Sequence, residues 1–319
     1  MKIIKIIIVL ILIPYIGFTQ PSLTNAQTIT EAKSIIKAYL NPLSSSISSS
    51  LNNGWYNTAK PHKLGGFDIT VTGNFVMVPK KMKTFIIDSV AGEFFSGGET
   101  PTILGNTDPG MIKASNAISS SSPMPKGLNI PIVPLPMLQI GVGLIKGTEV
   151  NLRYIPKIKT GKFGKAGLFG FGFKHDLLQW IPIVDKIPIN LSIQAGYSKL
   201  EADVSLEDVL QNNQVSTTMK IEATTINLIL SKKVLMFTPY IGLGYNSSKT
   251  NLSIANGETY NLANLPILTN NLNPIEFEDN NNLRANIGFR FNITVLALQA
   301  NYTFSEYPVA TLGAGISLR

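Results

Sequence analysis

Three arginines stand among polar residues in segments where polar and apolar side chains alternate. Successive side chains of a strand point to opposite faces, so the polar residues of such a segment share one side. We expect that side to line an enclosed interior, where guanidinium groups can form an electrostatic constriction that favours anions. Alternatively, the arginines pair with Asp68, Glu149 or plug residues and simply satisfy a filled interior, which is the preferred interpretation. The lumen-lining candidates are Arg153, Arg284, Asn286, Arg290, Gln299 and Gln194.

Catalytic and metal-binding motifs are the other possible sources of chemistry. The chain has two histidines, His62 and His175, and no cysteine. Neither histidine has partners at metal-ligand spacing, and no phosphate-binding loop, dinucleotide fingerprint or Gly-x-Ser-x-Gly motif is present. We therefore expect no catalytic, metal or cofactor-binding residues and no enzymatic activity; a hydrolase assembled from distant residues is the third functional hypothesis. Without cysteine there can be no disulfides, so strand pairing and packing must hold the fold.

One connection of the chain is basic. It contains Lys157, Lys159, Lys162 and Lys165, which can meet lipopolysaccharide phosphates if this connection lies outside the cell. A solvated basic loop is the alternative. The formal net charge is +8, or about +6 without residues 1–26, but the other lysines are scattered with little aromatic interleaving. No nucleic-acid partner is therefore predicted.

The elements that must position these residues are strands. Residues 283–292 put Leu, Ala, Ile, Phe and Phe on one side and Arg, Asn, Gly, Arg and Asn on the other, and alternation returns in 296–305 and 310–318. Only 14% of residues are charged, against about 25% in soluble proteins. Beyond the N-terminus no apolar run approaches the roughly 20 residues of a spanning helix. We therefore predict a membrane barrel with lipid outside and a polar interior; a soluble all-β protein is the alternative.

The predicted fold is all-β, a closed antiparallel transmembrane barrel over residues 67–319. About eleven strands are visible, one of them at 84–91, and bacterial barrels are even-numbered, so we expect about twelve strands, within a range of ten to fourteen. The missing strand should lie in residues 92–136, a stretch rich in Gly, Ser and Pro that otherwise reads as loop.

Connection lengths predict the orientation, because bacterial barrels have short periplasmic turns and long external loops. The short turns are 146–147, 232–233 and 292, and the long connections are 157–165, 200–214 and 247–282. Aromatic residues near strand ends are candidates for the interfacial girdles or for ordinary packing: Tyr154, Trp180, Tyr197, Tyr245 and Tyr302.

Two segments precede the barrel. Residues 1–26 have a basic start, a short apolar core and small residues before Gln27, the features of a cleaved secretory signal peptide. Residues 27–66 are predicted as a helical segment and linker, with two short amphipathic helices divided at Asn41-Pro42. These helices can plug the lumen or form a periplasmic cap under the rim, and both alternatives stay open.

Two blocks and the glycine-rich terminal strand carry a resemblance to a known family. The first block, Gly54-Trp55-Tyr56-Asn57-Thr58-Ala59-Lys60, runs into Gly65-Gly66-Phe67-Asp68-Ile69-Thr70; the second is Phe173-Lys174-His175-Asp176-Leu177-Leu178-Gln179-Trp180. With them the chain resembles, over most of its mature length, an uncharacterised outer-membrane barrel family of Bacteroidota, a domain of unknown function. The resemblance implies a membrane barrel and carries no activity to transfer. More distantly, helices ahead of a barrel are similar to the plugged barrels of the fatty-acid-transporter type.

Two functional hypotheses stand before the enzyme. The first is a small channel or plugged transporter for an unidentified solute in the bacterial outer membrane. The second is a structural or adhesive barrel with a filled lumen and no transport role. The predicted partners are outer-membrane lipid, lipopolysaccharide, the barrel-assembly machinery and, for the first hypothesis, a small solute; no cofactor is expected.

Overall fold

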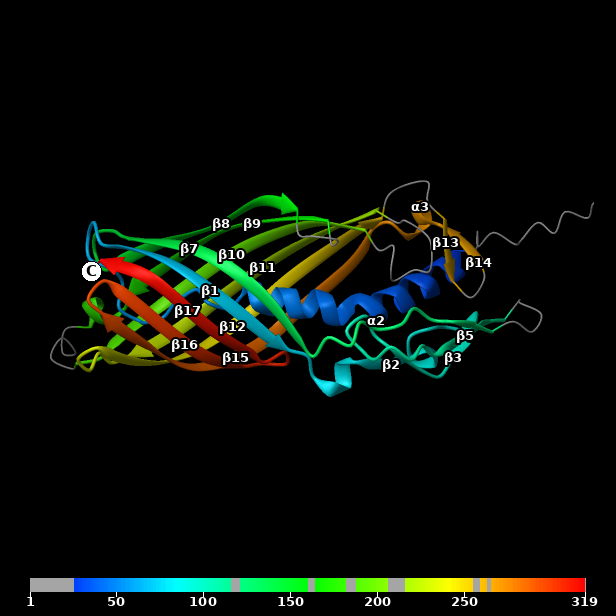
Figure 1. Ribbon diagram of the computed structural model, residues 1–319, viewed down its shortest axis with the longest axis horizontal. Helices are drawn as coiled ribbons and strands as arrows, with labels where there is room; N and C mark the ends of the chain where they lie inside the picture. Colours follow the sequence, from blue (N-terminus) through cyan, green and yellow to red (C-terminus); the bar gives the residue numbers. More distant parts are fainter. Residues whose placement is uncertain are drawn as a thin grey trace, which may run out of the picture.

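Ten strands form one closed barrel in which every neighbouring pair is antiparallel (Figure 1). The computed structural model describes residues 26–115, 121–159, 164–181, 188–205, 216–254, 259–262 and 265–318. The barrel strands are β1 (Phe67–Met77), β7 (Ile132–Gly143), β8 (Thr148–Lys159), β9 (Lys165–Asp176), β10 (Asn190–Ser205), β11 (Ser216–Ser231), β12 (Phe237–Ile254), β15 (Ile275–Ile293), β16 (Leu296–Phe304) and β17 (Val309–Leu318). β1 closes the barrel by pairing with β17 on one side and β7 on the other. The predicted closed antiparallel barrel is confirmed, whereas the predicted signal peptide lies, except for Ala26, outside the described residues.

The strand number is ten, within the predicted range of ten to fourteen and two below the expected twelve, because residues 78–131 leave the barrel between β1 and β7. This loop-end extension contains two small sheets, one of β2 and β4 and one of β3, β5 and β6. The predicted strand at 84–91 was wrong: three residues pair as β2, and a 3-10 turn follows. The described part of 92–131 holds only strands of three or four residues, which are too short for the 9–11 that cross a membrane. The elements are η1 (Lys80–Met82), β2 (Thr84–Ile86), η2 (Ile87–Ser89), β3 (Phe95–Gly97), β4 (Glu99–Pro101), β5 (Met111–Ala114) and β6 (Ser121–Pro123).

The outer face of the barrel is apolar. Along each strand, exposed apolar side chains alternate with buried ones that are mostly polar, as strand geometry requires. The exposed side chains include Ile69, Val71, Leu138, Ile140, Leu152, Phe171, Ile193, Leu228, Leu243, Ile287, Phe289 and Leu312. No second sheet covers them among the described residues, so this arrangement matches the lipid-facing surface of a membrane barrel and not a sandwich.

The two ends of the barrel differ in their connections. At the end that we call the turn end, β7–β8, β11–β12 and β15–β16 are joined by two to five residues, and Lys146 and Gly147 both have positive φ, as in a tight hairpin turn. The last of these turns falls at residues 294–295, two residues later than predicted. The two longest connections, residues 78–131 and 255–274, lie at the opposite, loop end, where β10, β11, β12 and β15 continue well beyond the short β16–β17 hairpin. The separation by length is incomplete, because the 13-residue connection 177–189 lies at the turn end, and the predicted long connection at 157–165 is a link of five residues at the loop end.

A single helix, α2 (Ala26–Leu51), enters the barrel from the loop end (Figure 1). Two helices divided at Pro42 were predicted, and this division was wrong. Proline supplies no N–H to the helix ladder, but surrounding structure can compensate for an interrupted backbone. Here the backbone N–H of Ile103 donates to the Tyr39 carbonyl at 3.0 Å, and the Tyr39 hydroxyl donates to the Lys126 carbonyl at 2.9 Å. The loop-end extension therefore braces α2 close to its proline.

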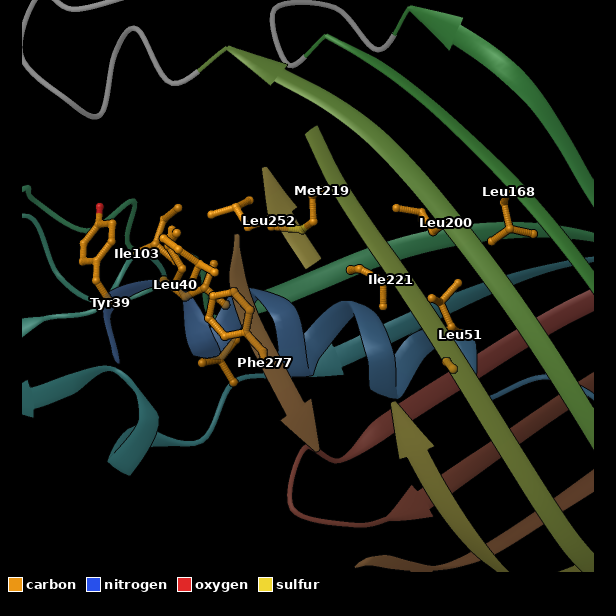
Figure 2. Close-up of a cluster of buried hydrophobic side chains, with 14 of the residues drawn as sticks. Tyr39, Leu40, Leu51, Ile103, Leu168, Leu200, Met219, Ile221, Leu252 and Phe277 are labelled. Atoms are coloured by element: carbon orange, nitrogen blue, oxygen red, sulfur yellow. The ribbon is translucent and has the colours of Figure 1, made fainter. Parts of the chain in front are cut away.

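The loop-end half of the interior combines an apolar cluster with buried serines of α2, of which Ser44 donates from Oγ to Thr250 Oγ1 at 2.8 Å. Leu40 and Leu51 of α2 pack against inward-facing side chains of β9 to β12 and β15, and Figure 2 shows this cluster around the helix. Its wall members include Leu168, Leu200, Met219, Ile221, Leu252 and Phe277. Beyond the barrel, Ala32 and Ile35 pack on the small sheets of the extension and on α3. The remaining elements are η4 (Leu178–Trp180), β13 (Thr259–Leu262), β14 (Leu265–Leu268) and α3 (Thr269–Leu272).

Candidate functional site

The chain that follows α2 fills the turn-end half of the barrel interior. We call residues 52–62 the strap. Gly54 adopts φ +75°, a conformation that glycine tolerates, and turns the chain out of the helix. The strap side chains Trp55, Tyr56 and Asn57 are buried against the barrel wall. Of the two alternatives left open by the sequence, α2 and the strap are therefore a plug and not a periplasmic cap.

Two of the arginines predicted to line the lumen bind the junction between α2 and the strap. Arg153 of β8 donates from Nη1 to the Leu51 carbonyl and from Nη2 to the Asn53 carbonyl, each at 2.8 Å. Arg284 of β15 donates to the Asn52 carbonyl at 2.6 Å. The last carbonyls of a helix lack intrahelical donors and carry the negative end of the helix dipole. The two guanidinium groups supply hydrogen-bond donors and positive charge at this end. The arginines pair with backbone of the plug and not with Asp68 or Glu149.

Trp55 lies against a patch of glycines in the barrel wall. A Cβ atom on Gly172 or Gly196 would stand within 3 Å of its indole ring, so larger residues would displace it. The Arg153 guanidinium carbon lies 3.6 Å from the ring centroid, a cation–π contact. The glycines on the inner side of β9 and β10 thus make room for a lumenal side chain.

The middle of the strap bonds to polar wall side chains. Arg290 Nη1 donates to Asn57 Oδ1 at 2.7 Å, and the Tyr56 hydroxyl donates to Asn286 Oδ1 at 3.1 Å. Two further candidates, Gln194 and Gln299, are buried in the wall. Gln194 Oε1 accepts from Asn227 Nδ2 at 2.6 Å, whereas Gln299 is the cross-strand neighbour of Arg290. All six lumen-lining candidates are thus buried in the barrel wall, and on β15 Arg284 binds the start of the strap while Arg290 binds its middle, six residues nearer the turn end.

A buried charge cluster holds the turn end of the strap. Glu149 Oε2 accepts from the His62 backbone N–H at 3.0 Å and lies 2.8 Å from His62 Nδ1, while Glu149 Oε1 lies 2.9 Å from Lys174 Nζ. His62 Nε2 lies 3.2 Å from Ser317 Oγ and 3.5 Å from Asp68 Oδ2. We call these five residues the latch.

The latch places a serine, a histidine and a carboxylate in the order of a hydrolase triad, but its surroundings differ from those of a working triad. In a triad, the carboxylate orients the histidine and stabilises its protonated form. Here the carboxylate of Glu149 is paired with the ammonium group of Lys174. Asp68 competes with Ser317 for the same histidine nitrogen, and Ser317 is 92% buried on the inner wall. The arrangement therefore suits a structural junction between strap and wall.

The basic connection lies apart from this site. Lys157 pairs with Asp203 at 3.2 Å and with Glu201 at 3.7 Å on the neighbouring part of β10. Lys165 is exposed at the start of β9. Lys159 ends β8, and Lys162 lies outside the described residues. The contact of these lysines with lipopolysaccharide stays a prediction.

Sequence reasoning did not identify the strap residues or Lys174 as partners of the wall. Two signals point to them. Trp55 and Lys174 stand in the two blocks that carried the family resemblance, and Gly170 and Gly172 interrupt the inner side of a strand that is otherwise well patterned. Among the described residues no group of three or more His, Cys, Asp or Glu side chains could hold a metal ion, and no helix is long and apolar enough to cross a membrane.

The family model for a family of unknown function, DUF6588, matches residues 1–318. The chain belongs to this family. Its match spans the strap, the latch and all ten barrel strands, so these features lie within one DUF6588 unit. No match to this DUF6588 chain was found among curated proteins.

Solved structures similar to this DUF6588 chain are bacterial barrel proteins. The transport unit of the autotransporter AIDA-I from Escherichia coli is 11% identical, with 87% of this chain and 99% of that chain covered and a TM-score of 0.37. Neisserial surface protein A is 9% identical, with 79% and 96% covered and a TM-score of 0.25. The TodX monoaromatic hydrocarbon channel is 8% identical, with 86% and 74% covered and a TM-score of 0.28. At these TM-scores, no functional argument follows from the likenesses.

Proposed function

We propose that the protein is an outer-membrane channel that its own strap keeps closed, and that a solute passes only when the strap leaves the lumen. The observation that supports this proposal most directly is the polar contact between strap and wall. Arg153, Arg284 and Arg290 each bind the plug through hydrogen bonds, and wall side chains at this level are buried. An open pore would leave them in contact with water, so the described state is closed.

Part of the strap contact is polar, and water can replace that part. Neutral hydrogen bonds exchanged for water cost only about 0.5–1.5 kcal/mol each, and those from a charged group about 1.5–3 kcal/mol. Trp55, Tyr56 and Ala59 also form a small apolar cluster with Ile229 and Tyr240, which a leaving strap would have to break. Some buried polar atoms at this contact, among them Trp55 Nε1 and Asn227 Oδ1, have no protein partner. Groups of this kind are usually met by water, which eases the exchange of protein contacts for solvent.

A structural barrel with a permanently filled lumen is the second candidate. The fit of Trp55 to Gly172 and Gly196 favours it, because a wall shaped around one side chain stabilises the filled state. In this case the barrel would serve to hold α2 and the loop-end extension at one membrane face. The two candidates differ in whether loosening the strap opens a conducting path.

Single-channel recording in planar bilayers tests the proposal. We expect the wild type to be mostly closed and the double variant Arg153→Met with Arg284→Met to raise the open probability at least a hundredfold, since it removes three charged hydrogen bonds to the plug that are worth roughly 1.5–3 kcal/mol each. Lys157→Met, which removes an exposed cation from the same strand as Arg153, is the matched control and should leave the open probability unchanged.

A labelling experiment decides between the candidates if no current appears. The chain has no cysteine, so Thr58→Cys gives a single thiol on the buried strap. A thiol that becomes reactive in the double variant without any conductance would contradict the channel and support the structural barrel. A reactive thiol together with conductance would support the channel.

The remaining expectations belong to this proposal. Location in the outer membrane is supported by the apolar outer face and by the two longest connections, residues 78–131 and 255–274, which lie at the same end. Export by a signal peptide, origin in Bacteroidota, insertion by the barrel-assembly machinery and lipopolysaccharide contact at the loop end stay predictions, as does the absence of enzymatic activity.

A further inference from the structure

A groove of about 670 Å³ lies on the outer face of the barrel, across β10, β11, β12 and β15. Its side-chain lining is apolar and exposed, with Ile226, Leu228, Leu243 and Leu283 among its members. We propose that this groove binds one acyl chain of a membrane lipid from the leaflet at the loop end. The inference rests on the proposed membrane location and is independent of whether the barrel conducts.

The strand register explains why the surface is hollow here. Ile193, Leu228, Leu243 and Ala285 are successive cross-strand partners, so they form one row across the outer face. Ala285 is the small member of that row, and its outward neighbours on β15 are the larger Leu283 and Ile287. A methyl group between such side chains leaves space that no other side chain of the lining fills.

Charged residues show which part of a lipid would meet the groove. Towards the loop end from Tyr245, the outward-facing Lys199, Glu222, Lys249 and Glu278 are again successive cross-strand partners. This row of alternating charge lies four residues, about 14 Å along the strand, beyond Tyr245 of the groove. Charges at that height suit a headgroup region, and the groove then lies at the depth of the upper acyl chains.

We expect van der Waals packing, and not the hydrophobic effect, to hold the acyl chain of the lipid in the groove. Lipid tails are as apolar as the barrel surface, so moving a tail from bulk lipid into the groove removes no water. A tail confined between Leu243 and Leu283 makes van der Waals contacts that a mobile neighbour cannot make as fully. The expected result is one slowly exchanging lipid per barrel.

Native mass spectrometry of the full chain, purified from membranes in mild detergent, tests the site. We expect a species with one bound phospholipid or lipopolysaccharide mass, and Ala285→Phe should fill the hollow and reduce its abundance about tenfold. Ala314→Phe is the matched control, because Ala314 is an outward-facing alanine on β17, away from the groove. It should retain the lipid.

Three results would overturn the proposal. The adduct could be absent from the wild type, it could survive Ala285→Phe unchanged, or it could have the mass of a small hydrophobic solute. Ala285→Leu is a milder filler in case the phenylalanine variant does not fold, and heat-resistant migration on SDS gels reports the folded barrel. A chain that stays in solution without detergent would instead contradict the membrane location itself.

Discussion

The two halves of the barrel interior hold the same plug by different physics. Towards the loop end, α2 packs Leu40 and Leu51 into an apolar cluster that includes Ile221 (Figure 2). Towards the turn end, the strap bonds to arginines, amides and the latch, with Arg153 at the junction. Both halves are built from one set of alternating strands, so only the residue types on the inner face differ. The comparison teaches that α2 is held mainly by apolar packing, whereas the strap depends more on hydrogen bonds that water can replace, beside a smaller apolar cluster.

The largest expected effect comes from breaking the latch. Glu149→Gln removes the charge that Lys174 faces at 2.9 Å and leaves a buried ammonium without its counter-charge. We expect a loss of about 3–5 kcal/mol in the free energy of unfolding. The double variant Glu149→Leu with Lys174→Met should recover part of that loss, because matched apolar residues can replace a buried ion pair but leave the His62 backbone N–H without its acceptor. Urea unfolding in detergent measures both, and no difference between them would contradict the role of the pair.

Truncation of the apolar half should cost somewhat less. Ile221→Ala opens a cavity under α2, and removal of a buried isoleucine side chain to alanine costs about 2–5 kcal/mol. Ile226→Ala on the same strand is the matched control, since Ile226 faces outward and is about half exposed. Its smaller effect on the urea midpoint would separate interior packing from general strand propensity. Equal effects would contradict the assignment of inner and outer faces.

An effect of intermediate size is expected where α2 meets the loop-end extension. Burial raises the pKa of Glu31, but backbone hydrogen bonds from Phe95 and Phe94 outweigh it and hold the pKa below its ordinary value. A carboxylate with a lowered pKa stabilises the folded form above its unfolded pKa of about 4.3, and this stability is lost as the pH falls through the folded pKa.

Hydrogen exchange of residues 92–97 measures this contact. As the pH falls below the unfolded pKa of Glu31 and through its folded pKa, residues 92–97 of the wild type should exchange faster. The rates are compared after correction for the pH dependence of intrinsic exchange. At neutral pH, Glu31→Gln should exchange faster than the wild type, by an amount that corresponds to a loss of about 1–2 kcal/mol of local stability. Acid should then change its exchange little further. Glu99→Gln is the comparison, because its carboxylate is in the extension but accepts from Thr84 Oγ1 and not from residues 92–97. A variant with wild-type pH dependence would contradict the role of Glu31.

The smallest effect on stability is expected at Trp180, which is mostly exposed at the turn end and donates its indole N–H to His175 Nε2 at 2.9 Å. Trp180→Phe should change unfolding by no more than about 0.5 kcal/mol. Its fluorescence is informative because the chain has two tryptophans. With Trp55→Phe as background, shallow brominated lipids should quench Trp180 strongly. With Trp180→Phe as background, the lumenal Trp55 should be protected from quenching by these lipids. Quenching of Trp55 without quenching of Trp180 would contradict both placements.

The sequence predicts the barrel better than its contents, for a physical reason. Strand alternation has a period of two, so Ile287 and Arg290 can be assigned to opposite faces without a structure. The strap has no period, and its conformation depends on wall residues more than 80 positions away, such as Gln139 bonded to the Trp55 carbonyl. Glu149 was expected as a partner for arginine, but it faces Lys174 and His62, since local patterning does not determine pairing across strands.

The helix and the strand count show the same limit. Pro42 signals a helix break in isolation, yet hydrogen bonds from the loop-end extension brace the helix next to it. Residues 84–91 alternate enough to predict a membrane strand, but only Thr84–Ile86 form a strand, which pairs with β4 outside the barrel. In both cases tertiary contacts override a local preference.

The β1–β17 seam has a consequence for biogenesis. The segment that ends up inside, α2 with the strap, comes directly before β1, and β1 makes the final ring closure with β17. Threading 26 helical residues through a finished ring would require stripping them of their contacts. In the simplest folding route, α2 therefore packs on the inner face of a sheet that is still open. Pairing of β1 with β17 then closes the barrel around the plug as the last step.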